Sequence, residues 1–343
     1  MSDARQPFLI AYLGSWGNWQ PETIDAKKLT HLCYAFAHIK DGRVVPSADS
    51  DARERLAGVR RLKALHPELE VLISVGGWAA EGFSDAALTA ESRAVFADSA
   101  LAFAEEHGFD GVDLDWEYPS NPMAGIRARP EDRKNFTLLL EATRKALGGR
   151  YPLSIAAGAQ PFYLEGADVG PACELCDFVN LMTYDLYNGW SKVSGHHANL
   201  FRSPHDPSGD SADRAVELFT GQGVPASKLV LGAAFYGRGM KGAAATNHGL
   251  MQPTTPESNF TKTYAEIKRE FLGDARFVRY WDDAAKAPWL HDGDTFLSYE
   301  DPESIRHKAR YVRERGLAGV MFWEYTQDEN GELLGALHGA LRG

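Results

Sequence analysis

Short apolar runs alternate along the chain with longer stretches in which apolar residues recur every three to four positions. The short runs are typical of buried strands and lie at 8–12, 31–39, 70–75, 111–117, 153–157, 178–184, 229–236 and 319–323. The longer stretches are typical of helices and include 51–65, 91–107, 131–147 and 302–315. Because strands that alternate with helices form parallel βαβ units, these eight repeats predict an α/β protein with a (β/α)8, or TIM, barrel.

The helix at 302–315 is the best defined of these. Ile305, Ala309 and Val312 follow one another at intervals of four and three residues, which places them on one helix face. Pro302 lies where a first-turn proline is favoured, and Gly316 lies where a glycine commonly ends a helix.

The regular spacing of the strands is interrupted once. About 80 residues separate the seventh strand from the eighth, which is more than one helix and two loops need. This stretch contains a helical segment at 264–271 and strand-like pieces at 277–281 and 295–298. We therefore expect a single barrel domain over 1–343, with 239–297 forming a small α+β insertion on the carboxyl-terminal face of the barrel.

Composition and charge exclude several classes of protein. Of the 343 residues, 44% are apolar and 24% are charged, as in ordinary globular proteins. The net charge of -11 disfavours a nucleic-acid partner, because binding to phosphates needs clustered Lys and Arg. No apolar run reaches the roughly 20 residues that span a bilayer. Cys173 and Cys176 have a CxxC spacing but lack the second pair of ligands that a zinc site needs.

The strand-like run at 111–117 carries three acids. Because side chains alternate between the two faces of a strand, Asp113, Asp115 and Glu117 share one face and the apolar residues between them share the other. In a barrel the apolar face meets the helices, so the acids point inward, where they are costly unless hydrogen-bonded or partly protonated. Asp110 has the opposite parity and is expected to hold the start of the strand. A solvated edge strand with one polar face stays open as the alternative.

Glu117 lies at the end of this run, where the catalytic groups of barrels gather. Successive residues on one strand face are only ~7 Å apart. In a partly dry site the three acids are therefore expected to share protons, which raises the pKa of Glu117. A carboxylic acid that stays protonated near neutral pH suits the cleavage of a glycosidic bond, and the spacing alone would make Asp115 the nucleophile.

The sequence FDGVDLDWEYP at 109–119 is similar to the DGxDxDxE motif of glycoside hydrolase family 18 chitinases. Four further segments resemble motifs of the same family in the expected order: SVGGW at 74–78, MTYD at 182–185, YGR at 236–238 and the tryptophan at 323. One match can arise by chance, but five in register over nearly the whole chain favour a bacterial-type member of this family with an α+β insertion.

The resemblance implies a retaining mechanism in which the N-acetyl carbonyl of the substrate is the nucleophile and closes an oxazolinium ring. Glu117 would protonate the glycosidic oxygen. Asp115 would orient the acetamido N–H and stabilise the ring, while Asp113 would hold the shared proton network. Tyr184 would hydrogen-bond the acetamido oxygen. Because the substrate supplies the nucleophile in this mechanism, Asp115 would not be the nucleophile that the spacing alone suggests.

The resemblance also implies a sugar-binding cleft. Trp323 would form its floor, and Trp78 and Trp190 would stack on the leaving-group side. Trp281, in the insertion, would form a wall. The other expected contacts are Tyr12 and Ser74, which would hydrogen-bond the aspartates, and Phe36, Gly77, Tyr118, Met182, Asp185, Tyr236 and Arg238.

Two pairs of residues have more open interpretations. Trp16 and Trp19 are as compatible with surface packing as with sugar binding. His196 and His197 have no carboxylate or Cys at the spacing of a metal site, so they are expected to be structural or to contact sugar. Neither a metal nor another cofactor is expected.

The implied activity is hydrolysis of β-1,4 linkages in chitin and its oligomers by a chitin-binding monomer, with no nucleic-acid or membrane partner. In this family the insertion accompanies a deep groove and attack from chain ends or processive attack. A catalytically inactive chitin-binding lectin is disfavoured because the three acids are all present. An endo-N-acetylglucosaminidase acting on N-glycans is disfavoured by the insertion and by Trp78 and Trp190.

The N-terminal residues Met1 to Pro7 lack the basic, apolar and small-residue regions of a Sec-type signal peptide. Chitin as a substrate implies action outside the cell. Three locations therefore stay open: the protein is exported by another route, it was exported by a signal that has been removed, or it is cytoplasmic.

Overall fold

The computed structural model describes residues 6–17 and 19–343. Within them, eight parallel strands form a ring: β1 (Phe8–Gly14), β2 (His31–Lys40), β4 (Glu70–Gly76), β5 (Gly111–Asp115), β6 (Leu153–Gly158), β7 (Phe178–Met182), β8 (Leu229–Ala234) and β14 (Gly319–Trp323). β1 pairs with both β2 and β14, which closes the sheet. A short strand that was not expected, β3 (Arg43–Val45), pairs antiparallel with β2. The predicted TIM barrel is confirmed.

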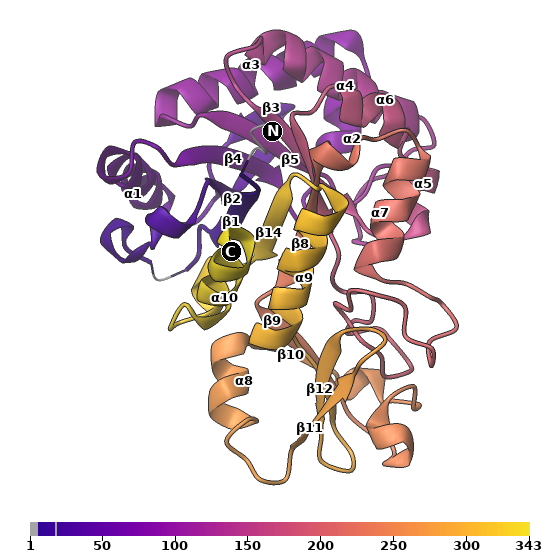
Figure 1. The fold of residues 1–343 in the computed structure, drawn as a ribbon. Helices are drawn as coiled ribbons and strands as arrows, with labels where there is room; N and C mark the ends of the chain where they lie inside the picture. The colour runs from indigo at the N-terminus through magenta and orange to yellow at the C-terminus, as the bar shows by residue number, and fades with distance from the viewer. Residues whose placement is uncertain (1–5, 18) are drawn as a thin grey trace.

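Helices surround the barrel (Figure 1). The longer ones are α1 (Ala52–Leu65), α3 (Ala90–His107), α4 (Asp132–Leu147), α7 (Ala212–Gly221), α9 (Pro302–Arg315) and α10 (Glu332–Arg342). Short ones are α2 (Phe83–Ala86), α5 (Pro161–Gly166) and α6 (Val169–Glu174). The helix predicted at 302–315 coincides with α9, in which Ile305, Ala309 and Val312 are buried and Gly316 adopts the left-handed conformation of a cap.

A second sheet lies between β8 and β14 in the sequence and beside the barrel in space, in orange at the bottom of Figure 1. Its antiparallel strands are β9 (Tyr236–Met240), β10 (Phe260–Thr263), β11 (Val278–Asp282), β12 (Ala287–His291) and β13 (Phe296–Ser298), and α8 (Tyr264–Glu270) follows β10. The helix and the strands expected at 277–281 and 295–298 are present. That 239–297 form a subdomain of their own stays a prediction.

Two strands end earlier than their apolar runs predict. β5 stops at Asp115 rather than at Glu117, and β7 stops at Met182 rather than at Tyr184. The predicted strand at 229–236 is divided into β8 and β9, because the N–H of Phe235 donates to the carbonyl of Trp323 and the chain turns into the second sheet. In each place the chain leaves the barrel wall at its carboxyl-terminal rim, which frees the following side chains to enter a site.

β5 is an inner strand of the barrel, since it pairs with β4 on one side and with β6 on the other. This excludes the solvated edge strand. Trp116 packs on the helix side, stacked on Phe83 at 5.2 Å and edge-on to Phe136. Asp110 accepts a hydrogen bond from the N–H of Val71 and pairs with Lys63 at 2.6 Å, so it holds the start of the strand as expected.

Candidate active site

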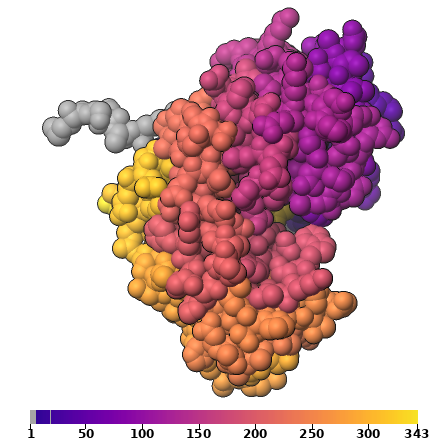
Figure 2. Space-filling view, turned by 90° about the vertical axis from the view of Figure 1, so that its right-hand side faces the viewer, coloured from indigo at the N-terminus to yellow at the C-terminus, as the bar shows by residue number. Residues whose placement is uncertain are grey.

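A cavity of about 980 Å³ opens where the barrel strands end, a size typical of ligand sites. Residues from seven of the eight barrel strands line it, all except β8, together with Tyr236, Arg238 and Thr261 of the second sheet. Figure 2 shows a hollow in this face of the molecule, between the violet and magenta part of the chain and the pink part. Asp115, Glu117, Tyr184 and Trp323 all line the cavity.

Asp113 lies beneath the cavity, fully buried in the barrel. The register of the parallel strands pairs it with Ser74 on β4 and Ser154 on β6, so the three side chains lie at one level. Both hydroxyls donate to its carboxylate, at 2.8 and 2.6 Å, and the hydroxyl of Tyr12 donates at 2.9 Å. The amide of Asn180 is a further donor at 3.4 Å. Burial raises the pKa of Asp113, and these donors oppose the rise.

Asp115 is buried one step nearer the cavity, and its Oδ1 atom accepts no hydrogen bond in the described part of the chain. Burial raises the pKa of Asp115 well above its usual range, and the charges of Glu117 and Asp113 raise it further. Gly76 and Gly77 allow the chain to approach this point closely. Both have positive φ; a Cβ on Gly76 would collide with the carbonyl oxygen of Asp115, and the N–H of Gly77 donates to that oxygen at 2.9 Å.

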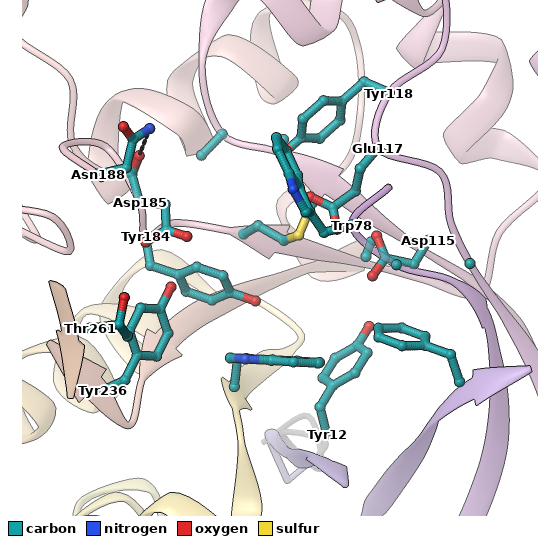
Figure 3. Close-up of a pocket in the computed structure, with 18 of the residues that line it drawn as sticks. Tyr12, Trp78, Asp115, Glu117, Tyr118, Tyr184, Asp185, Asn188, Tyr236 and Thr261 are labelled. Atoms are coloured by element: carbon teal, nitrogen blue, oxygen red, sulfur yellow. Dashed lines mark hydrogen bonds between the residues drawn. The ribbon is translucent and has the colours of Figure 1, made fainter. Parts of the chain in front are cut away.

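Glu117 lines the cavity itself. Burial raises its pKa to about 7, a hydrogen bond with Tyr118 opposes the rise, and the charge of Asp185 adds to it. A group with this pKa is a competent acid and a competent base at neutral pH. Figure 3 shows the carboxyl groups of Asp115 and Glu117 facing the same space, with the ring of Tyr184 extending toward them from the opposite side.

Tyr184, Asp185 and Arg238 line the side of the cavity opposite Asp115 and Glu117. Tyr184 donates weakly to the sulfur of Met321 at 3.8 Å. The carboxylate of Asp185 is held by Arg238 through two hydrogen bonds, of 2.7 and 2.6 Å. Burial would raise the pKa of Asp185, but the neighbouring His197 and Arg238 outweigh burial and hold it well below its usual range. Asp185 therefore brings a fixed negative charge to the cavity.

Aromatic side chains line the rest of the cavity. Trp323 stacks on Phe36 at 5.7 Å and also contacts Tyr12. Trp78 and Trp190 are 46% and 65% exposed, and their rings lie 5.5 Å apart at the cavity mouth. Exposed indoles that stay out of the core are suited to stack on the apolar faces of sugar rings.

Besides Asp113, two expected site residues, Trp281 and Ser74, lie outside the cavity lining, and the open alternatives for Trp16 and Trp19 differ in outcome. Trp281 does not wall the cleft, which corrects the expectation: it lies on β11 with its ring near His307 of α9 and Arg279, while its neighbour Tyr280 packs on Trp289. Ser74 is buried under Asp113 and touches the site only through that residue. Trp19 is buried and donates to the carbonyl of Gly14, so it packs, whereas Trp16 lines the cavity and is half exposed.

The structure adds site residues that the sequence did not reveal. Ser154 was visible only as a polar residue inside an apolar run, and no motif includes it. The further cavity residues lie on loops, on the short helix α5 or on the second sheet and include Met123, Gln160, Phe162, Asn188 and Thr261. Their positions carry no periodic pattern, so their approach to the acids becomes visible only in the folded chain.

His196 and His197 are both buried, in agreement with a structural role. Within residues 6–17 and 19–343, no group of three or more His, Cys, Asp or Glu side chains is arranged to hold a metal ion. Over the same residues no helix is long and apolar enough to cross a membrane.

The family model for glycosyl hydrolases family 18 matches residues 9–328. Chitinase A1 of Niallia circulans is 34% identical, over 94% of this chain and 56% of that protein, so the chain spans little more than half of that relative. Endochitinase 1 of Metarhizium robertsii is 31% identical, over 93% of this chain and 81% of that protein.

Solved structures agree with this match. A family 18 N-acetylglucosaminidase from Paenibacillus barengoltzii is 43% identical, with a TM-score of 0.92 over 97% of this chain and 99% of that one. Chitinase ChiA74 from Bacillus thuringiensis is 34% identical, with a TM-score of 0.91 over 99% of this chain and 70% of that one. The sequence motifs, the barrel and the match over nearly the whole chain agree: the chain belongs to glycoside hydrolase family 18.

Proposed function

We propose that this chain is a chitinase that hydrolyses β-1,4 linkages between N-acetylglucosamine residues with retention of configuration, with Glu117 as the acid and base. The observation that carries the proposal is the buried, unpartnered Oδ1 of Asp115 beside an acid whose pKa is about 7. A buried acceptor without a donor is costly, and the N–H of a substrate acetamido group would supply one.

The chemistry divides between substrate and protein. Glu117, protonated, gives its proton to the glycosidic oxygen as the bond to the anomeric carbon breaks. The acetamido carbonyl oxygen bonds to that carbon on the other face, and the resulting oxazolinium carries a positive charge that ionised Asp115 offsets. Glu117, now a carboxylate, takes a proton from the water that opens the ring. Tyr184 would donate to the acetamido oxygen, and Trp323 would support the sugar ring.

The test compares Glu117→Gln with Glu165→Gln, a matched change at an exposed glutamate outside the cavity. On a fluorogenic chitotriose glycoside, Glu117→Gln should lose about 10²–10⁴-fold in kcat, because general acid catalysis contributes a factor of that size. It should still bind chitooligosaccharides in a fluorescence titration. A Glu117→Gln enzyme within tenfold of wild type would contradict the assignment, as would an inverted anomer appearing first by NMR.

An N-acetylglucosaminidase that removes single terminal sugars is the second candidate, since the structural relative from Paenibacillus barengoltzii is named as one. Products from the soluble chitin hexamer separate the two. Early release of dimers and trimers supports the chitinase, whereas early release of monomer alone supports terminal cleavage.

A further inference from the structure

His197 lies at the base of the segment that joins β7 to α7. Its carbonyl accepts a hydrogen bond from the N–H of Leu186 at 3.1 Å, and its own N–H donates to the hydroxyl of Ser298 on β13 at 2.9 Å. The chain between Leu186 and His197 therefore leaves and returns at one point, and it carries the cavity residues Asn188 and Trp190. His197 joins this loop to the second sheet.

The ring of His197 is fully buried, and neither of its nitrogens has a hydrogen-bond partner among the described residues. Its Nδ1 faces Oδ1 of Asp185 at 3.8 Å, slightly longer than a hydrogen bond. One ring face contacts Tyr236 at 5.2 Å between centroids. A buried polar atom rarely stays unpaired, so the orientation of Nδ1 toward the carboxylate of Asp185 indicates that the two groups interact.

Burial favours a neutral His197 ring, and the charged groups round it act in both directions, since Arg238 favours the neutral form while Asp185 and Glu300 oppose it. Asp185 approaches from the end of β7, Arg238 and Tyr236 from β9, and Glu300 from the segment after β13. Arg238 is paired with Asp185, and Glu300 is paired with the buried Lys308 at 2.6 Å. Burial lowers the pKa of His197, and the charge of Asp185 only partly opposes this.

We infer that His197 is a positioning residue, whose neutral ring directs its Nδ1–H at Asp185 and keeps that carboxylate ionised and oriented toward the sugar in acidic solution. The inference rests on the proposed function. The side chain of Asp185 is 35% exposed at the cavity, so it is half-buried, and with Arg238 as its only partner its partial removal from water would still disfavour the charged form. The histidine adds a neutral donor, and a neutral donor does not cancel the negative charge that Asp185 exerts on Glu117.

The direction in which the pH dependence of catalysis should change follows from the pKa of Asp185. In the native protein its pKa is lowered, so it stays charged as the pH falls. Without the Nδ1–H, burial is opposed by Arg238 alone, the pKa rises, and Asp185 becomes protonated at a higher pH. The acidic limb of kcat/KM should then move to higher pH, while the rate at neutral pH changes little.

The experiment measures kcat/KM on a chitotriose glycoside from about pH 3 to about pH 8 for His197→Gln, which keeps an N–H donor, and for His197→Phe, which has a ring without one. His197→Phe should move the acidic limb up by about one pH unit, equivalent to roughly tenfold lower kcat/KM on that limb. His197→Gln should lie within a few tenths of a unit of wild type. A uniform loss at every pH in both variants would show a merely structural role and overturn the inference.

A second measurement needs no substrate. In wild-type protein labelled with ¹⁵N-histidine, the resonance missing from the His197→Gln spectrum should be that of a neutral ring protonated at Nδ1 from about pH 5 to about pH 8. A ring that titrates near the ordinary pKa of about 6.5, or one protonated only at Nε2, would overturn the inference. A wild-type protein inactive on chitooligosaccharides would refute the proposed function but leave this measurement decisive for His197.

Discussion

At the scale of single residues, the properties of Glu117 come from its neighbours. Burial disfavours its charged form, and the negative charge that Arg238 and His197 fix on Asp185 disfavours it further. The same pairing therefore does two things: it holds Asp185 charged, and it helps to keep Glu117 protonated. A carboxylic acid alone in water would be ionised at neutral pH and could not protonate a leaving group.

The pH dependence of catalysis should report this pKa. Since the pKa of Glu117 is raised to about 7, its acid form is fully present at lower pH and is lost as the pH rises through that value. We expect kcat/KM on a chitotriose glycoside to fall about tenfold for each unit above about pH 7. Asp185→Asn should move this limb to lower pH, because the charge that raises the pKa is removed. If Asp185→Asn left the basic limb of kcat/KM unchanged, or if the wild-type limb lay near the ordinary pKa of a glutamate, the assignment of this limb to Glu117 would be wrong.

The donors round Asp113 should contribute to stability. Ser154→Ala removes the shortest of the hydrogen bonds to this carboxylate, at 2.6 Å, in a site without exposure to solvent. Hydrogen bonds to charged groups contribute about 1.5–3 kcal/mol, so urea denaturation should show a loss of that size in the free energy of unfolding. Ser258→Ala, at an exposed serine of the second-sheet region, should change it by less than about 0.5 kcal/mol. Equal effects of the two changes would contradict the assignment.

At the scale of elements, the sequence predicted the strands well and their ends poorly. The alternation of acids and apolar residues placed Asp113 and Asp115 on the inner face of β5, because the two-residue period of a strand is local geometry, whereas Glu117 follows the end of the strand. The end of β5 at Asp115 depends instead on pairing partners in β4 and β6, which lie far away in the sequence. The expectation that Trp281 walls the cleft was wrong for a similar reason. Which side chains of β11 face the cavity depends on how the second sheet packs against the barrel, and the local sequence does not encode that packing.

The buried ion pair between α9 and the loop before it should stabilise the rim of the barrel. Lys308 donates to Glu300 at 2.6 Å and to the carbonyl of Gly232, and Glu300 accepts from the N–H of Ala234 at the end of β8. Lys308→Met leaves the Glu300 carboxylate buried without its counter-charge, which should cost about 3–5 kcal/mol of unfolding free energy in urea denaturation.

The double variant Lys308→Met/Glu300→Gln is the control for this pair. It removes both charges and keeps an acceptor for the N–H of Ala234, so it should recover a substantial part of the lost stability. If the double variant is as unstable as Lys308→Met, packing of the lysine side chain rather than an uncompensated charge is responsible.

At the scale of the whole molecule, the cavity is assembled from segments that no local pattern connects. Trp78 follows β4, Trp190 follows β7, Thr261 lies on β10 and Trp323 ends β14, yet all four line one cavity. The barrel accounts for Trp78, Trp190 and Trp323, because parallel strands bring their carboxyl-terminal ends together. Thr261 reaches the cavity through the antiparallel pairing of β10 with β9, whose Arg238 stands opposite it. That contact has no counterpart in the sequence motifs, so it could not be predicted.

Two tryptophans provide a test of this arrangement. Trp190, 65% exposed at the cavity mouth, should stack on a sugar beyond the cleaved bond, whereas Trp281 packs near α9 outside the cavity. Losing one aromatic contact of about 1 kcal/mol should lower kcat/KM for the chitin hexamer roughly fivefold in Trp190→Ala. A fluorogenic dimer glycoside that does not reach this position should be cleaved at the wild-type rate. Trp281→Ala should lower the melting temperature while both rates stay unchanged, because its ring contributes to packing alone. If Trp281→Ala slowed the hexamer as much as Trp190→Ala does, the second sheet would have to present its other face to the substrate.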